Sequence, residues 1–326
     1  MLAARVVALS LLCSPALAGC AEDSPEPIFL GVAGSGAFQV PPTFVPGGGA
    51  GAGGAGAAGA AGAGGAPACS LSLPVASVDA ATALDRALEG YALAVGAEVR
   101  ALDGAACPES ASATASPGVG TIRALATVDG VAFVAGASGV RAGAATCPGG
   151  GLVSLAREGA RAVGLTADGA SLARLSRVTA KPGSGVPKEV CEREDVPLLG
   201  AARAVTLGAS AVPGTVWAAF APTSGSVFVA RVDVATGATL PDVKLTSLCG
   251  ADAVVDLGAR IAVLDATCRR VAVFESSGAR VIDRSLGALP RAMAASADDA
   301  AAVIIASAIS TPPTARVDFQ RLSLAD

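Results

Sequence analysis

The sequence predicts an all-β fold, a β-propeller of about six blades, and three observations lead to this prediction. A tight-turn signal followed by a short apolar run recurs six times along the chain. Counted on their last residues, these signals are spaced by 40, 39, 45, 45 and 40 residues. Glycine and β-branched residues are too frequent in most of these units for helices. Repeats of about 40 residues that each hold several strands are typical of β-propellers.

The chain begins with a segment that has the layout of a secretory signal. One positive charge, Arg5, precedes an apolar run from Val6 to about Leu12, and small residues lead to Cys20. The alternative is a transmembrane helix. The apolar stretch from residue 6 to residue 19 is too short and too interrupted for it, because a spanning helix needs about 20 apolar residues.

The last residues of this segment, Leu17-Ala18-Gly19-Cys20, resemble the lipobox of bacterial lipoproteins. The resemblance implies cleavage before Cys20, a diacylglyceryl group on its sulfur, and a further acyl chain such as palmitate on the new amino terminus. It also implies a membrane contact through this lipid anchor and a body in the periplasm or at the cell surface. Ala21, in place of the aspartate that often retains this family in the inner membrane, favours the outer membrane of the cell envelope.

A linker separates the anchor from the repeats. Residues 20–46 are weakly hydrophobic and contain several prolines, and residues 47–66 are only glycine and alanine. Such a segment has no side chains with which to build a core, so we expect a disordered tether. The predicted organisation is therefore a signal peptide at 1–19, a lipidated arm and linker at 20–66, and a propeller domain at 67–326.

The turn signals mark the units that should become blades. They are Leu88–Gly90, Val128–Gly130, Ala167–Gly169, Val212–Gly214, Leu257–Ala259 and Ala297–Asp299. The last unit stops after its third strand, near Leu322–Leu324, and Cys69–Leu73 at the other end would supply the fourth strand and close the ring. One local alternative remains, a helix over the alanine- and leucine-rich residues 77–102.

A short element in the fourth unit also indicates a propeller. Asp233-x-x-Thr236-Gly237 has turn chemistry and resembles blades of quinoprotein-like bacterial propellers. The resemblance covers one blade and implies an architecture, not an enzyme.

Six cysteines remain in the exported body, and their even number indicates disulfides. They are Cys69, Cys107, Cys147, Cys191, Cys249 and Cys268. Pairing consecutive cysteines places the midpoint of each pair at a turn of the first, third or fifth unit. Residues equidistant from a turn face each other across a hairpin, so 69–107, 147–191 and 249–268 should each close one blade. The alternative is that some are free, buried thiols.

The composition excludes several classes of function. There is no histidine, which removes serine- or cysteine-histidine triads and histidine-ligated zinc. The formal net charge of −4 is unlike that of a nucleic-acid-binding protein. No Cys-x-x-Cys pair and no regular calcium-loop spacing occurs, so the sequence predicts no catalytic residue, no metal site and no cofactor.

Four arginines form the candidate site, because each begins a unit in the pattern Arg-Ala-apolar. They are Arg123, Arg161, Arg203 and Arg291, and Asp252 takes this place in the fifth unit. The first strand of every propeller blade lines the central channel, so the four could ring one mouth and attract an anionic group. The alternative is a set of solvated arginines at the starts of strands.

Two other features carry weaker signals. The segment Lys181–Pro197 is the most polar part of the body, and we expect a solvated loop held by Cys191. Calcium binding by Glu192, Glu194 and Asp195 is its alternative. Trp217, the only tryptophan, is expected in the core.

Taken together, the anchor, the tether and the repeats predict an envelope lipoprotein whose propeller is a binding or scaffolding module. Its partner would be an envelope protein or a small anionic ligand. One alternative is a propeller enzyme or cofactor-binding protein with sugar or quinone/calcium chemistry. The other is a purely structural envelope component.

Overall fold

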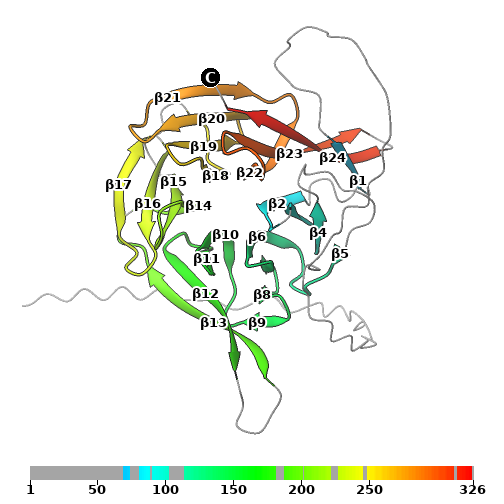
Figure 1. The fold of residues 1–326 in the computed structure, drawn as a ribbon, viewed down its shortest axis with the longest axis vertical. Helices are drawn as coiled ribbons and strands as arrows, with labels where there is room; N and C mark the ends of the chain where they lie inside the picture. The colour runs from blue at the N-terminus through cyan, green and yellow to red at the C-terminus, as the bar shows by residue number, and fades with distance from the viewer. Residues whose placement is uncertain are drawn as a thin grey trace, which may run out of the picture. The chain divides into compact units, whose positions relative to one another are not determined.

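Short apolar strands joined by tight turns fold into six four-stranded antiparallel sheets, arranged as blades around one axis (Figure 1). The coordinates are a computed structural model that describes residues 69–73, 81–88, 90–102, 114–180, 187–200, 202–221, 227–244, 248–311 and 314–324. All regular elements in these ranges are strands, so the predicted six-bladed propeller is confirmed. The described ranges contain no helix long and apolar enough to cross a membrane.

Blades 1 to 5 are each built from four consecutive strands. Blade 1 contains β2 (Ala81–Arg86), β3 (Tyr91–Val95), β4 (Glu98–Leu102) and β5 (Thr114–Ala115). Blade 2 contains β6 (Ile122–Val128), β7 (Val131–Gly136), β8 (Gly139–Ala142) and β9 (Ala145–Cys147). Blade 3 contains β10 (Leu152–Glu158), β11 (Arg161–Thr166), β12 (Ser171–Ala180) and β13 (Lys188–Pro197).

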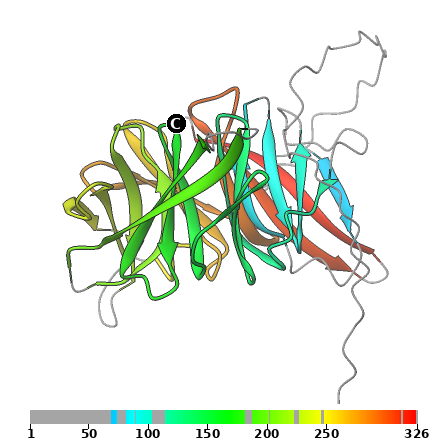
Figure 2. The same cartoon turned by 90° about the horizontal axis from the view of Figure 1, so that it is seen from below.

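Blades 4 and 5 repeat the same meander. Blade 4 contains β14 (Ala204–Ala209), β15 (Thr215–Phe220), β16 (Phe228–Asp233) and β17 (Thr239–Lys244). Blade 5 contains β18 (Ala253–Asp256), β19 (Arg260–Asp265), β20 (Arg270–Glu275) and β21 (Arg280–Ser285). Figure 2 shows the sheets side by side from a direction perpendicular to the first view.

Blade 6 closes the ring with a strand from each end of the domain. It contains β22 (Leu289–Ala295), β23 (Ala302–Thr311), β24 (Thr314–Ser323) and β1 (Cys69–Leu73), in the order β1-β24-β23-β22. β1 pairs with β24 from Cys69↔Phe319 to Leu73↔Ala315. The predicted closure by residues 69–73 is therefore confirmed.

The blades are held together by an apolar core between each neighbouring pair. Each innermost strand contributes one large apolar side chain that packs against the preceding blade: Leu84, Leu125, Leu155, Leu207, Val254 and Met293. Burying such a side chain stabilises the fold by about 1.5–3 kcal/mol. The core between blades 6 and 1 contains Leu84 together with Phe319, so the ring is closed by side chains as well as by strands.

A bulge recurs at the same place in five of the six innermost strands. The register shifts fall between Ala81 and Ala83, Ile122 and Ala124, Leu152 and Ser154, Ala204 and Thr206, and Pro290 and Ala292. The bulge aligns the innermost strands residue by residue, with the first position just before it. We therefore number six equivalent positions in each innermost strand, such as 81–86 in β2 and 122–127 in β6.

One sequence expectation about an element is wrong, and one alternative is excluded. The helix kept as an alternative for residues 77–102 does not form: the described part of this range contains β2, β3 and β4 of the expected first blade, because packing between blades outweighs the helix propensity of alanine. Lys188–Pro197 is the strand β13 instead of a loop, and its charges are used in ion pairs such as Arg174–Glu194 and Arg177–Glu189 with β12. Residues 181–186 lie outside the described residues.

One predicted turn, in blade 3, joins different strands from those expected. Ala167–Gly169 joins the second and third strands of blade 3, whereas the first turn of that blade contains Gly159. Blade 2 ends in the short strands β8 and β9, and blade 3 has the ten-residue strands β12 and β13. The short end of blade 2 and the long strands of blade 3 offset each other in length. The second turn of blade 3 therefore falls about 40 residues after the first turn of blade 2, where the first turn of blade 3 was expected. The turn predicted at Asp233–Gly237 is present, and Asp233 accepts the amide of Thr236 there.

The two described disulfides join the pairs of cysteines that the sequence predicts, but one of them connects two blades instead of closing one. Cys147 is bonded to Cys191, and these residues lie on β9 and β13, the outermost strands of blades 2 and 3. This bridge therefore ties two neighbouring blades, and the expectation that it closes a single blade is wrong because it used the misassigned turn. A bridge of this kind contributes about 2–4 kcal/mol.

The second described bridge lies within blade 5. Cys249, just before β18, is bonded to Cys268 in the turn between β19 and β20. Buried Asp265 accepts the backbone amides of both cysteines and pairs with Arg270. Cys69 is also disulfide-bonded, and its predicted partner Cys107 lies outside the described residues.

Gly208→Ala is expected to lower the free energy of unfolding by about 1–3 kcal/mol, the usual cost of overpacking. A Cβ on Gly208, in β14, would overlap the carbonyl group of Val254 in the next innermost strand. Gly287→Ala is the control, because a Cβ there meets nothing within 4 Å. Urea unfolding of both variants measures the difference, and equal stability of the two would contradict this account of blade spacing.

Candidate functional site

The six innermost strands surround an axial channel. β2, β6, β10, β14, β18 and β22 are each in contact with the next around the ring, and together they line a cavity of about 330 Å³. We call the mouth where these strands begin the N-side mouth and the mouth where they end the C-side mouth. Four residue steps along a strand separate the two mouths by about 13 Å.

Hydrogen bonds join successive innermost strands from inside this channel. Thr82 donates to the carbonyl of Ile122 at 2.9 Å. Ser154 accepts the amide of Leu207 at 3.0 Å, and Thr206 donates to the carbonyl of Asp252 at 3.3 Å. Each bond connects similar positions of neighbouring strands, so the strands run in the same direction. These side chains satisfy backbone groups at the open edge of the next blade.

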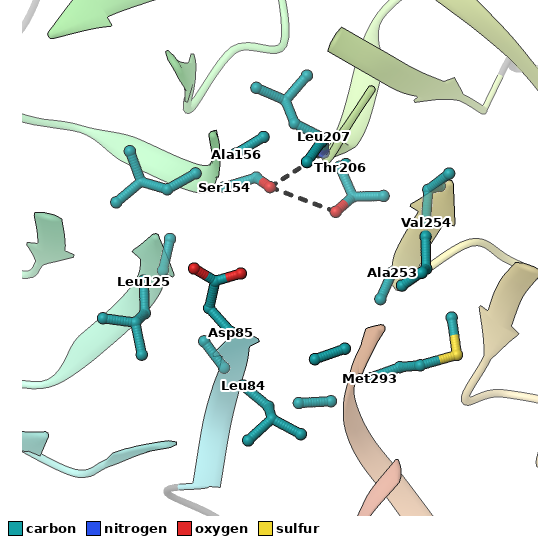
Figure 3. A pocket seen from close by; sticks show the side chains of 18 of the residues that line it. Leu84, Asp85, Leu125, Ser154, Ala156, Thr206, Leu207, Ala253, Val254 and Met293 are labelled. Carbon is teal, nitrogen blue, oxygen red and sulfur yellow. Dashed lines mark hydrogen bonds between the residues drawn. The ribbon is translucent and has the colours of Figure 1, made fainter. Parts of the chain in front are cut away.

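Asp85 is an exception in its layer of the channel. It occupies the fifth position of β2, and the other innermost strands have small or apolar residues there: Ala126, Ala156, Gly208, Val255 and Ala294. Figure 3 shows the carboxylate of Asp85 turned into the open space, while Leu84 and Leu125 point away from it. The repeat therefore places a single carboxylate where five blades have none.

The surroundings of Asp85 oppose its negative charge. Burial raises its pKa from 3.8 to about 6, and this effect outweighs the opposing effects of the amides of Thr127 and Arg86, the charge of Arg157 and the hydroxyl of Thr127. The amide of Thr127 donates to Oδ2 at 2.5 Å. No side-chain cation among the described residues lies within ion-pair distance of this carboxylate. A charged group kept under such conditions in a cavity marks a candidate binding residue.

The other two acids of the channel wall have structural partners. Asp252 accepts the amide of Ala266 at 2.8 Å. Asp256 accepts the indole N–H of Trp217 at 2.8 Å and the amide of Ala211 at 2.9 Å. Trp217 is 4% exposed, which confirms the expected core position. Asp85 also accepts a backbone amide, that of Thr127, and its carboxylate is turned into the open channel (Figure 3).

The structure does not bring the four predicted arginines together. Arg123 and Arg291 occupy the second position of their innermost strands and line the channel near its N-side mouth. Arg161 begins β11, the second strand of blade 3, and is outside the cavity lining. Arg203 is also outside it, and donates to the carbonyl of Asp168 at 3.2 Å. The predicted ring is therefore reduced to two members.

Sequence reasoning missed the residues of the opposite mouth, Asp85, Arg86 and Arg157. Arg86 and Arg157 hold the sixth position of β2 and β10, and both line the channel. The signal was available in one blade, because Arg157 directly precedes the turn at Gly159. Assigning that turn to the first hairpin would have put Arg157, and not Arg161, in the channel.

One further cluster has metal-ligand residue types but no metal chemistry. The ligand atoms of Cys249, Asp265 and Cys268 lie within 4.8 Å of one another. The two sulfurs are bonded to each other, and the carboxylate of Asp265 is used by backbone amides and Arg270. This cluster has a structural role, since it links the segment before β18 to the turn between β19 and β20.

The sequence matches no protein-family model, and no curated protein matches it. Among solved structures, glutaminyl cyclase of Myxococcus xanthus is 11% identical, with 78% of this chain and 96% of that chain covered and a TM-score of 0.42.

Two other solved structures are similar to the same extent. Virginiamycin B lyase of Staphylococcus aureus with quinupristin is 10% identical, with 78% of this chain and 88% of that chain covered and a TM-score of 0.45. The Pan2 WD40 domain of Neurospora crassa is 10% identical, with 73% of this chain and 75% of that chain covered and a TM-score of 0.40. Likenesses at this level carry no argument about chemistry. The chain is a six-bladed β-propeller with an axial cavity, and its function has to be inferred from its own residues.

Proposed function

We propose that this protein is a lipid-anchored, extracytoplasmic binding module that takes up a small polar ligand in the axial channel of its propeller. The observation that carries the proposal is Asp85. It is the one acid in its layer of the channel, it faces the cavity of about 330 Å³, and burial disfavours its charge. A cavity of this size fits a small molecule.

The cost of ionised Asp85 is the reason to assign it a role in binding. Asp85 accepts the amide of Thr127 in the next blade, but a neutral side chain could accept it too, and equivalent positions in other blades are alanine, glycine or valine. A ligand that donates a hydrogen bond or carries a positive charge would satisfy the carboxylate. Charge-assisted hydrogen bonds of this kind are stronger than neutral ones. Ser154 and Thr206 add hydroxyl groups to the same wall.

A ligand screen tests the binding proposal. The mature protein in detergent is heated with organic acids, amino acids, amines and sugars in turn, and the unfolding temperature is measured. A ligand at 100 times its Kd stabilises the protein by about 2.7 kcal/mol. We expect one class to stabilise the native protein and to stabilise Asp85→Asn much less. If no class does so, or if the variant responds equally, the channel is not the site, and a scaffolding role should be tested by cross-linking in cells.

Cys20→Ser is expected to abolish the anchor. In cells supplied with labelled palmitate, the native protein should incorporate label and sediment with the membranes, whereas the variant should do neither. The thioether needs the sulfur of Cys20, which serine lacks. Cys13→Ser is the control, since Cys13 lies inside the signal segment and should not be acylated. Labelled Cys20→Ser protein would overturn the assignment.

A second candidate function is supported by one observation. The pKa of Asp85 is about 6, close to the range in which a carboxyl group serves as a general acid or base. A propeller enzyme would then convert the ligand that the screen identifies. Turnover of that ligand by the native protein, lost in Asp85→Asn, would favour this function over binding alone.

A further inference from the structure

We propose that the C-side mouth of the channel contains an oxyanion subsite, formed by Arg86, Arg157 and the hydroxyl of Thr127, that binds the acid group of the channel's ligand. The inference rests on the proposed binding function and specifies its ligand. The ligand would be a small organic acid, with a carboxylate or phosphate at the mouth and a donor group directed to Asp85.

The three residues form one layer of the ring. Arg86, Thr127 and Arg157 occupy the sixth position of β2, β6 and β10, the innermost strands of three consecutive blades. The other half of this layer is Ala209, Asp256 and Ala295. The positive charges are therefore concentrated on one side of the mouth, and Asp256 on the other side is held by Trp217.

These residues also line a cavity of their own. A hollow of about 200 Å³ is lined by Arg86, Thr127 and Arg157 and by the turn residues Leu88, Asp129 and Gly130. The two arginines line the axial channel as well, so they lie where the two cavities meet. The lining contains two arginines and one acid, Asp129, so it carries a net positive charge.

Donors in this cavity are available to a ligand. Arg86 donates one N–H to the carbonyl of Ala297 at 3.1 Å, which fixes the side chain and leaves its other donors. Arg157 is exposed and forms no hydrogen bond or ion pair with the described residues, although its charge acts on Asp85. Guanidinium groups match the geometry of carboxylate and phosphate oxygens.

Thr127 supplies a third polar group to this hollow. The residue is 3% exposed, and its hydroxyl lies close enough to the carboxylate of Asp85 to lower the pKa of that group, without a hydrogen bond of regular geometry to a described residue. Buried hydroxyl groups are almost always hydrogen-bonded in native proteins, so this one can donate to Asp85 or to an oxyanion bound beside the two arginines.

The test uses phosphate and acetate as probes, with the mature protein in detergent and chloride to hold the ionic strength constant. Thermal unfolding should show saturable stabilisation by at least one probe beyond that by chloride. The stronger probe identifies the acid group as phosphate-like or carboxylate. Arg157→Gln should weaken this binding by about tenfold or more, since a hydrogen bond to a charged group is lost.

Two variants separate the subsite from general electrostatics. Arg161→Gln removes the same charge from an exposed residue outside both cavities, and should bind the probe as the native protein does. Thr127→Val keeps the shape of the side chain and should also weaken binding.

The subsite is disproved if Arg157→Gln binds like the native protein, or if Arg161→Gln loses as much affinity. A channel ligand that still depends on Asp85 but not on Arg157 would leave the binding function standing and reject the subsite alone.

Discussion

A chain that begins at residue 74, and so lacks β1, is expected not to reach the native fold at 25 °C. Without Cys69–Leu73, blade 6 loses its outermost strand and all the backbone pairing of β1 with β24. Leu71 leaves the core between blades 6 and 1, and the disulfide of Cys69 is lost as well. The bridge alone contributes about 2–4 kcal/mol, and whole domains are stable by only about 5–15 kcal/mol.

Circular dichroism and urea unfolding measure this effect. The matched control begins at residue 68, which removes the same preceding segment but keeps β1. We expect the control to unfold cooperatively and the shorter chain to be unfolded or aggregated, because the exposed edge of β24 can pair with other chains. A third variant, Cys69→Ser in the control chain, separates loss of the bridge from loss of the strand. A cooperative, equally stable chain without β1 would show that the ring does not need this closure.

Asp85→Asn is expected to stabilise the protein at neutral pH by about 3 kcal/mol. The pKa of Asp85 rises from 3.8 to about 6 on folding, and each pKa unit corresponds to about 1.4 kcal/mol. Asparagine has no charge to desolvate, and its carbonyl oxygen can still accept the amide of Thr127. Because the folded pKa is raised, the native state binds the proton more tightly than the unfolded state does.

The sign of the pH dependence follows from this difference. Below about pH 3 Asp85 is protonated in both states, so native protein and variant should be equally stable. As the pH rises from about 3 to about 7 the native protein loses stability relative to the variant, and at higher pH the gap should stay constant. Urea unfolding at several pH values measures the gap.

Asp129→Asn controls for the loss of one negative charge, since Asp129 is exposed in a turn and its positive φ of 48° is tolerated by asparagine. A gap that does not change between pH 4 and pH 7 would mean that Asp85 is not buried as described. If Asp85→Asn is more stable than the native protein and also fails to bind in the ligand screen, then Asp85 lowers stability in exchange for binding, as is common at functional sites.

The architecture could be predicted because its signals are local. Turn residues and alternating apolar runs mark each hairpin, and the missing fourth strand of the last unit points to Cys69–Leu73 for closure. The strands of residues 81–102 were harder to predict. Alanine favours a helix there, and only contact with neighbouring blades, as for Tyr91 and Leu93 in the core with Phe319, decides for strands.

The site could not be predicted to the same extent, because it depends on register. Asp85 is unusual only when the innermost strands are aligned, and the alignment rests on bulges that leave no clear pattern in the sequence. In blade 3, taking Ala167–Gly169 for the first turn moved the expected channel residue from Arg157 to Arg161. The place of the Thr127 hydroxyl beside Asp85 and the two arginines is a property of packing, and an isolated threonine in a strand gives no sign of it.

The pairing of β1 with β24 also sets an order of events during synthesis. Ser70 and Asp318, which are hydrogen-bonded across this pair, are 248 residues apart in the chain. The ribosome makes β1 first and its partner almost last, so β1 has no native neighbour in its own sheet until nearly the whole domain exists. Contacts so distant in sequence slow folding and leave intermediates exposed to aggregation. The first strand of this domain is thus the one whose unpaired edge must be protected longest, and a chain interrupted before β24 cannot close its ring.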